Sequence, residues 1–100
     1  MINHIIMFNL RDDLSMEERK ALLRELPIAF GALPTVENFR MGNAVKCSWK
    51  TSDPRYEFMF SMDFRDEQAL GSYLEDHRGF SRSRFLPAVR EYLSLDVLLE

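Results

Sequence analysis

The sequence predicts an α+β domain of ferredoxin-like βαββαβ topology, in which helices cover one face of a four-stranded antiparallel sheet. Two observations predict this fold. Three segments alternate apolar with other residues at a period of two, which is typical of strands. Capping signals, and apolar residues spaced three or four positions apart, indicate helices between the strands. With one further strand before the middle of the chain, the order becomes strand, helix, strand, strand, helix, strand.

The first strand and the first helix have the clearest local signals. A strand is predicted over Ile2–Leu10, where the even positions are apolar except for His4 and the odd positions are mixed. The segment Ser15–Glu18 matches a capping box, in which the serine hydroxyl and the glutamate carboxylate satisfy free backbone N–H groups at a helix start. Pro27 is expected to kink this helix or to begin a second short segment. One apolar stripe follows the helix: Leu22, Leu26, Ala29, Phe30 and Leu33.

The remaining strands and helices follow at short intervals. A second strand is predicted over Val36–Asn43, and the clearest alternation in the chain predicts a third over Tyr56–Phe64. A short helix capped by its first residue is expected over residues 66–74. A further helix is expected over residues 80–89, and a last strand over Leu93–Leu99.

Length, charge and cysteine content limit the class of protein. A chain of 100 residues fits one domain, which we expect to span residues 1–100, and it is long enough to bury an apolar core. The formal net charge of −3 disfavours nucleic acid and anionic membranes as partners. Cys47 has no disulfide partner within the chain, and no apolar run suits a signal peptide or a membrane span, so we expect a cytoplasmic protein. We expect no cofactor, because the chain has no glycine-rich loop for a nucleotide.

One face of the predicted sheet is more apolar than a solvated face would be. Four large apolar residues are expected opposite the core-facing set: Ile5, Met7, Met59 and Leu98. A second copy of the chain is the simplest cover for such a surface, because closed two-fold pairing is the commonest form of assembly. We therefore expect a homodimer formed through this open sheet face.

Several features, taken in order, resemble one family. They are His4 and Phe8 on the first strand, the capped acidic helix, the strand Tyr56–Phe64, the segment Asp66-Glu67-Gln68-Ala69-Leu70, and Tyr73-Leu74 followed by His77 and Phe80. In this order and spacing the chain resembles the stress-responsive A/B barrel (Dabb) domain over nearly its whole length. The resemblance implies two subunits packed sheet to sheet as a dimeric α+β barrel.

The resemblance also points to a segment with candidate functional residues. The family pattern Tyr-x-x-His-Pro-x-His-x-x-Phe corresponds to residues 73–80, which are shorter by two positions and carry one histidine and no proline. His77 keeps the spacing to Phe80, so it is aligned with the second family histidine. A plant polyketide cyclase of the family is similar in having a first-strand histidine and a tyrosine–histidine pair here, which implies ring closure by aldol chemistry. Phe58 stands where that cyclase has a third-strand histidine.

His4, Tyr73 and His77 are the candidate catalytic residues. A neutral imidazole can remove a proton next to a carbonyl, and a phenol can hydrogen-bond to the developing enolate oxygen, without a metal. For His4, on the apolar face of its strand, the alternative is a buried core residue with its hydrogen bonds satisfied. His77 and Tyr73 are expected beside a helix end, where functional side chains are common.

Aromatic and charged residues supply further candidates. Five phenylalanines are expected either to line an apolar pocket for an aromatic or polyketide-like ligand or simply to form core: Phe8, Phe30, Phe58, Phe60 and Phe85. Arginines 78, 82 and 84 are interpreted as an ordinary helix surface. The acidic residues 12, 13, 63, 66 and 67 are interpreted as turn and cap residues, and we assign no metal site.

Three functions remain open from the sequence. The first is a homodimer with a pocket between sheet and helices that binds or transforms a small carbonyl or aromatic compound. The second is a structural or stress-protective dimer without turnover. The third, a cofactor-free monooxygenase, is suggested only by the shared dimeric barrel fold, and a fold alone does not determine an activity.

Overall fold

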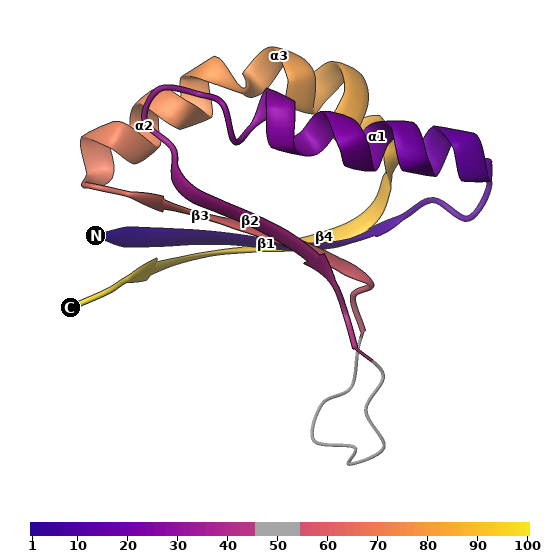
Figure 1. Ribbon diagram of the computed structural model, residues 1–100, viewed down its shortest axis with the longest axis horizontal. Helices are drawn as coiled ribbons and strands as arrows, with labels where there is room; N and C mark the ends of the chain where they lie inside the picture. The colour runs from indigo at the N-terminus through magenta and orange to yellow at the C-terminus, as the bar shows by residue number, and fades with distance from the viewer. Residues whose placement is uncertain (46–54) are drawn as a thin grey trace.

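The predicted βαββαβ topology is confirmed by a computed structural model, which describes residues 1–45 and 55–100 (Figure 1). The elements are, in chain order, β1 (Ile2–Leu10), α1 (Met16–Ala29), β2 (Glu37–Asn43), β3 (Phe58–Phe64), α2 (Glu67–Asp76), α3 (Arg78–Phe80), the π-helix η1 (Ser81–Phe85), α4 (Leu86–Ala88) and β4 (Val89–Leu98). Cys47 and most of the connection between β2 and β3 lie outside the described residues.

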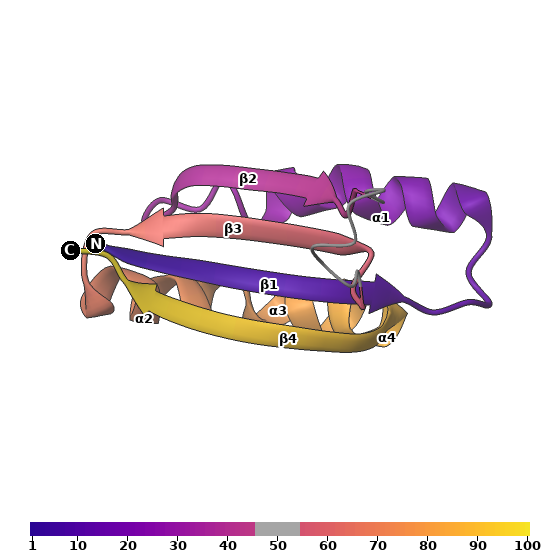
Figure 2. The same ribbon diagram turned by 90° about the horizontal axis from the view of Figure 1, so that it is seen from below.

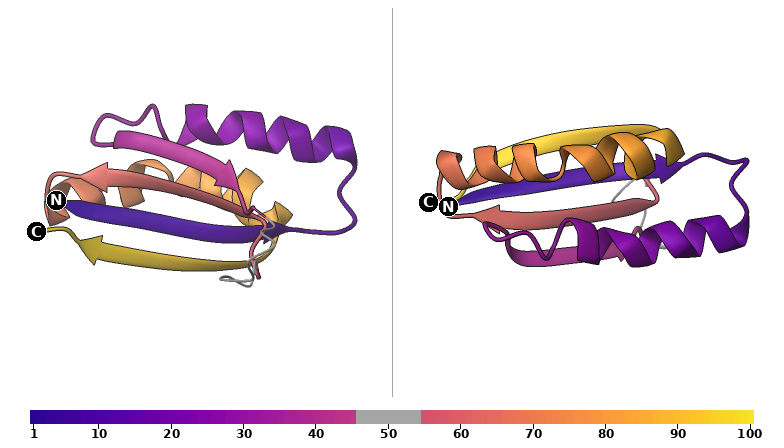
Figure 3. Two further views of the ribbon diagram at one scale, coloured as in Figure 1. Left: turned by 60° about the horizontal axis from the view of Figure 1, so that its bottom comes forward. Right: turned by 90° about the horizontal axis from the view of Figure 1, so that it is seen from above.

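The sheet has four strands in the order β2-β3-β1-β4, and each neighbouring pair is antiparallel. Figure 2 shows this order from the open face, and Figure 1 shows that all the helices lie on the other face. In Figure 3, α1 lies over the β2 side of the sheet, whereas α2 to α4 run over the β4 side. The layer between sheet and helices is therefore enclosed by two separate helical segments.

Helix α1 begins as its sequence predicts. The Ser15 hydroxyl accepts a hydrogen bond from the Glu18 backbone N–H at 3.1 Å, and the Glu18 carboxylate accepts one from the Ser15 backbone N–H at 3.2 Å. These reciprocal bonds satisfy N–H groups that have no partner within the helix. The helix continues through Pro27 to Ala29, so no second segment begins at the proline. Pro27 lies in the last turn, where its missing N–H removes only one bond of the helix.

The helix expected over residues 80–89 is divided into α3, η1 and α4. At the end of η1 the Leu86 backbone N–H donates to the Ser81 carbonyl, an i to i−5 bond that widens the turn. Pro87, which has no N–H to donate, stands at the start of α4. Strand β4 begins at Val89, earlier than the expected Leu93, because its pairing with β1 continues past a register shift.

The core lies between the sheet and the helices. The even positions of β1 are buried, as the alternation predicts. They include the polar residue His4, which is 4% exposed. Aromatic rings fill much of this layer; Phe8 stacks on Phe58 with ring centroids 5.4 Å apart. Within residues 1–45 and 55–100, no helix is both long and apolar enough to cross a membrane. The buried apolar side chains are Ile2, Ile6, Phe8, Leu10, Leu22, Leu26, Phe30, Phe58, Phe60, Met62, Phe64, Tyr73 and Phe85.

The open face of the sheet differs from the expectation at one position. Leu98 pairs with Ile2, whose side chain is in the core, so Leu98 belongs to the helix-covered side and its assignment to the open face was wrong. Both alternating sets of β4 contain leucines, and only the pairing with β1 shows which set faces the helices. The apolar residues of the open face are Ile5, Met7, Met59, Leu93, Leu95 and Val97.

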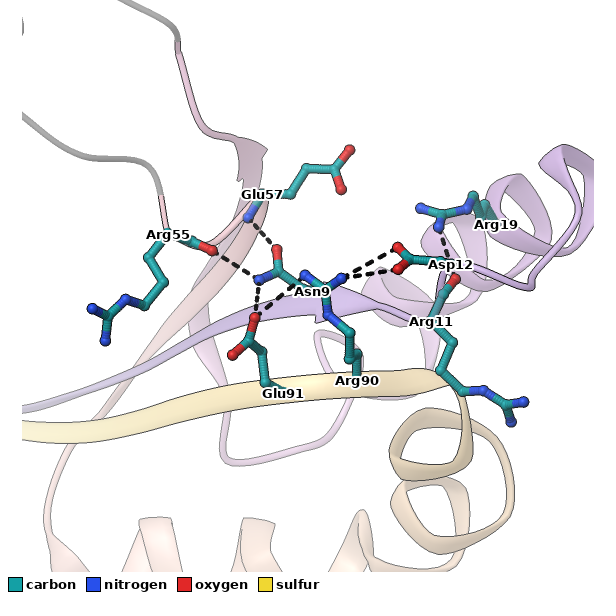
Figure 4. A network of polar contacts seen from close by, with 8 residues as sticks. All are labelled: Asn9, Arg11, Asp12, Arg19, Arg55, Glu57, Arg90 and Glu91. Carbon is teal, nitrogen blue, oxygen red and sulfur yellow. Dashed lines mark hydrogen bonds and ion pairs between the residues drawn. The ribbon is translucent and has the colours of Figure 1, made fainter.

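A buried asparagine ties one end of the sheet together (Figure 4). The Asn9 side chain, at 5% residue exposure, accepts a hydrogen bond from the Glu57 backbone N–H at 2.7 Å. Its amide group donates to the Arg55 carbonyl and to the Glu91 carboxylate, each at 2.8 Å. Arg90 beside it pairs with Asp12 at 3.1 Å. Asn9 therefore joins β1 to β4 and to the segment that leads into β3.

We predict that Gly31→Ala destabilises the protein by about 1–3 kcal/mol, because a Cβ in a packed site forces its neighbours to move. The added carbon would lie 2.6 Å from the Pro27 carbonyl oxygen and 2.9 Å from the Phe39 ring. Gly71→Ala is the matched control, since a Cβ there meets nothing within 4 Å and alanine favours the helix. Urea unfolding measures both variants. Equal stability of Gly31→Ala and the parent protein would contradict the prediction.

Candidate functional site

His4 is held in the core by a carboxylate from the neighbouring strand. The register of β1 and β4 places Asp96 directly opposite His4, and His4 Nδ1 hydrogen-bonds to Asp96 Oδ1. A carboxylate only accepts hydrogen bonds, so Nδ1 carries the proton and Nε2 keeps a free lone pair in the neutral ring. The side chain of Asp96 is 47% exposed, whereas that of His4 is 5% exposed.

His77 is oriented by the end of α2. Its Nδ1 lies 3.0 Å from the Tyr73 carbonyl oxygen and 3.0 Å from the Leu74 carbonyl oxygen. Because both partners only accept, Nδ1 is again the protonated nitrogen and Nε2 is the free acceptor. Burial lowers the pKa of His77 below its ordinary value, against the opposing effect of the two backbone hydrogen bonds. The imidazole is therefore neutral near pH 7 and able to accept a proton.

Tyr73 packs against both imidazoles. Its ring stacks on His77 with centroids 4.5 Å apart and meets the His4 ring at 5.7 Å. The residue is fully buried, and within the described residues its hydroxyl has no hydrogen-bond partner. Burial raises the pKa of Tyr73, and the negative charge of Asp96 raises it further. The phenol thus stays protonated. Tyr73 lies behind the two imidazoles in the core and is not among the residues that line the cavity described next.

The two histidines line a cavity of about 200 Å³ between the sheet and the helices. Among the predicted aromatic residues, Phe30 and Phe85 line it as well, whereas Phe8, Phe58 and Phe60 lie in the core and are not part of its lining. The structure therefore brings together His4, Tyr73 and His77 and separates the five phenylalanines into two groups. The rest of the lining is Ile6, Leu74, Ser81, Leu86, Tyr92 and Ser94.

Sequence reasoning missed the residues that β4 and η1 contribute. Asp96 is 92 positions from His4 in the chain, and only the strand register brings the two together. Tyr92 and Ser94 share the face of Asp96, because side chains two positions apart in a strand point the same way. Ser81 lies in the π-helix. No local sequence signal identifies any of these as a site residue.

Most of the charged side chains in the two predicted clusters take part in caps or ion pairs, but Asp63 lies within strand β3 and not in the turn or cap that was expected. Among the acidic residues, Asp12 pairs with Arg90, and the Asp66 side chain caps α2 by accepting from the Ala69 N–H at 2.8 Å. Hydrogen bonds from Asn38 and Asn3 lower the pKa of Asp63. The arginines are also partly paired, with Arg78 to Glu75 at 3.1 Å and Arg84 to Glu25 at 2.7 Å. In residues 1–45 and 55–100, no three His, Cys, Asp or Glu side chains group as a metal site.

Comparison with known proteins agrees with the fold. The family model for the stress-responsive A/B barrel (Dabb) domain matches residues 2–98. This chain belongs to the Dabb family. No curated protein sequence matches it. The expected family is confirmed by a match that spans every strand and helix described above.

Solved structures with the same fold include a Dabb family protein from Mesorhizobium loti. It is 29% identical, with a TM-score of 0.84, and the match covers 99% of this chain and 96% of that one. A ferredoxin-like protein of unknown function from Thermobifida fusca, described as dimeric, is 20% identical with a TM-score of 0.77 and coverages of 98% and 90%. Hydroxynitrile lyase from Passiflora edulis is 12% identical, with a TM-score of 0.86 and coverages of 99% and 93%. The last two similarities show the fold alone.

The lowered pKa of His77 predicts a pH dependence of stability. The unfolded chain binds a proton at the ordinary histidine pKa of 6.5, and the folded chain binds it only at lower pH. Between these two pKa values the unfolded state holds more protons, so the free energy of unfolding falls as the pH drops below about 6.5. His77→Gln should reduce this fall, as measured by urea unfolding at about pH 7.5 and about pH 5.5. An NMR titration midpoint of His77 above 6.5 would contradict the prediction.

Proposed function

We propose that this protein binds a small carbonyl compound in the histidine-lined cavity and transfers a proton next to the carbonyl group. The observation that carries the proposal is the arrangement of the three polar side chains. Both imidazoles are anchored through Nδ1, which leaves Nε2 of His4 and of His77 as proton acceptors. Tyr73, between them, keeps a buried phenol donor without a partner among the described residues.

The proposed reaction is enolisation. Nε2 of His77 takes a proton from the carbon next to the carbonyl, and the electron pair of that C–H bond becomes the carbon–carbon double bond of the enolate. The Tyr73 hydroxyl hydrogen-bonds to the oxygen on which negative charge develops. Return of the proton from the imidazolium to carbon regenerates neutral His77. Alternatively, the enolate attacks a second carbonyl, and the alkoxide formed on that carbonyl's oxygen takes the proton from the imidazolium. Phe30 and Phe85 supply apolar walls beside these polar groups.

Hydroxynitrile lyase from Passiflora edulis, which has the same fold, is an enzyme. Its 12% identity gives a precedent for catalysis on this fold and none for the substrate. For this chain the support comes from its own residues. An imidazole that is neutral near pH 7 and a protonated phenol are the two groups that enolisation requires, and neither needs a metal.

We further propose that the functional unit is a homodimer formed through the open sheet face. The neighbours from Thermobifida fusca and Jannaschia are described as dimeric, which supports self-association. The open face carries a group of six apolar side chains that residues 1–45 and 55–100 leave partly uncovered, among them Leu93 and Leu95 at 47% and 52% exposure. A second copy of the same face would bury them.

We predict that the protein accelerates hydrogen–deuterium exchange at the methyl groups of acetone in deuterium oxide, followed by proton NMR. His77→Gln should lower the catalysed rate by about 10²-fold or more, the contribution typical of a general base. Tyr73→Phe should lower it by about 10-fold to 10²-fold, because it removes a donor to the developing oxyanion.

Thermal unfolding of each variant separates chemistry from folding. Phe85→Leu is a control that changes the cavity wall and leaves the polar groups in place. If His77→Gln exchanges acetone as fast as the parent protein, the enolisation proposal is wrong. If no variant of the cavity changes exchange and His4→Ala only lowers the melting temperature, the non-catalytic structural dimer is the better description.

We predict that Met7→Asp combined with Met59→Asp dissociates the dimer, because two charges would be buried against the partner sheet. Leu98→Asp is the matched control, since Leu98 belongs to the other side of the sheet. Sedimentation velocity measures the oligomeric state, and far-UV circular dichroism checks the fold. A parent protein that is monomeric, or a doubly substituted protein that stays dimeric, would refute the proposed interface.

A further inference from the structure

A groove lined mostly by polar side chains lies at the end of the sheet where β2 begins and β3 ends. It measures about 490 Å³, within the range of about 300–1,000 Å³ that is usual for pockets that bind small molecules. Figure 1 shows the connection from α1 to β2 and the start of α2 at this end of the sheet. The polar residues of its lining are Thr35, Glu37, Arg65, Asp66, Gln68 and Ser72.

This polar groove is separate from the histidine-lined cavity, because the two spaces share no lining residue. On α2, Gln68 and Ser72 are four positions apart and lie on the same side of the helix. Leu74 and His77, which line the histidine cavity, lie on another side. Binding in the polar groove is therefore independent of the reaction proposed above, and so is its test.

The polar side chains of the groove have few partners within residues 1–45 and 55–100. Neither Arg65 nor Glu37 forms an ion pair with any of these residues. Asp66 Oδ1 accepts from the Ala69 N–H at 2.8 Å, which leaves the second carboxylate oxygen free to accept from a ligand. The Thr35 hydroxyl is buried without a hydrogen-bond partner among them. Buried polar groups are normally hydrogen-bonded, so this hydroxyl in the groove wall indicates a ligand there.

The charges of the groove indicate the class of ligand. Its lining carries two carboxylates, Glu37 and Asp66, and one guanidinium, that of Arg65. The complementary set is one carboxylate and two cationic groups, because opposite charges across an interface determine which partner binds. An α-amino acid with a basic side chain carries this set near pH 7. The lining offers only a proline and an alanine as apolar surface, so an aliphatic side chain would gain little there.

We propose that the polar groove binds a basic α-amino acid. Arg65 holds the α-carboxylate, because the planar guanidinium fork matches the two carboxylate oxygens. Asp66, the next residue, holds the α-ammonium group, which lies beside the carboxylate in the ligand. Glu37, on β2, holds the cationic group at the end of the ligand side chain. The amide of Gln68 and the hydroxyl of Ser72 add hydrogen bonds from α2.

Three ligands separate the contributions of the charges. L-Lysine carries all three charged groups, L-norleucine lacks the side-chain ammonium, and 1,5-diaminopentane lacks the α-carboxylate. Calorimetry at low ionic strength gives Kd for each ligand, and the NMR amide signals of residues 65–72 locate the binding. For the parent protein, the Kd of lysine should be about tenfold lower than that of either analogue, the effect of one charge-assisted hydrogen bond.

Two substitutions of exposed residues test the assignment of each charge. Arg65→Gln should weaken the binding of lysine about tenfold and should not weaken that of 1,5-diaminopentane, which has no carboxylate. Glu37→Gln should weaken the binding of lysine about tenfold and should not weaken that of norleucine. Arg82→Gln is the matched control, since Arg82 is also exposed, has no ion pair among the described residues and does not line the groove. It should match the parent.

The outcomes decide this inference and leave the proposed enolisation untouched. Equal Kd values for lysine and both analogues, or no ligand-induced shift of the signals of residues 65–72, would overturn it. If sodium acetate shifts these signals as strongly as lysine and Glu37→Gln has no effect, the groove binds a simple anion and the inference is wrong. Far-UV circular dichroism checks the fold of each variant. If Arg65→Gln keeps the fold and weakens all three ligands equally, Arg65 does not hold the carboxylate and the assignment fails.

Discussion

Strand β1 is hydrogen-bonded on both edges, to β3 and to β4, and this double pairing determines which residues of these three strands face the helices. A slip of one residue would exchange the two faces of β1 and move His4 from the core to the open face. The His4–Asp96 hydrogen bond exists only in the observed register. Asn9 secures that register at one end, because its buried amide bonds to the segment before β3 and to β4 at once.

Local signals were sufficient for most of the fold. The capping box at Ser15 and the cap at Asp66 place the starts of α1 and α2, because each satisfies backbone groups within a few residues. The failures concern choices that are not local. No local signal near Pro87 predicts the π-helix that precedes it. Both alternating sets of β4 residues contain leucines, so only the pairing with β1 shows which set faces the helices.

The sequence named three residues whose rings lie together in the structure, but it did not name the groups that orient them. His4, Tyr73 and His77 were identified as candidates, and the structure brings their rings together. The carboxylate of Asp96 and the carbonyls that fix the protonated nitrogen of His77 come from strand register and helix geometry. The division of the phenylalanines has a similar cause. Alternation shows that Phe8, Phe58 and Phe60 are buried, but only the packing of helices on the sheet shows where space is left.

The His4–Asp96 pair has a consequence for the exchange of protons with water. The imidazole is buried, and a buried group exchanges with solvent slowly unless the chain opens around it. Here Nδ1 is one hydrogen bond away from the carboxylate of Asp96, whose side chain is 47% exposed. The Nδ1 side of the ring is therefore linked to the surface through Asp96, on the side away from the cavity in front of Nε2. Burial of the imidazole thus does not isolate it from water, because the helices cover the ring whereas Asp96 connects its Nδ1 to the exposed edge of the sheet.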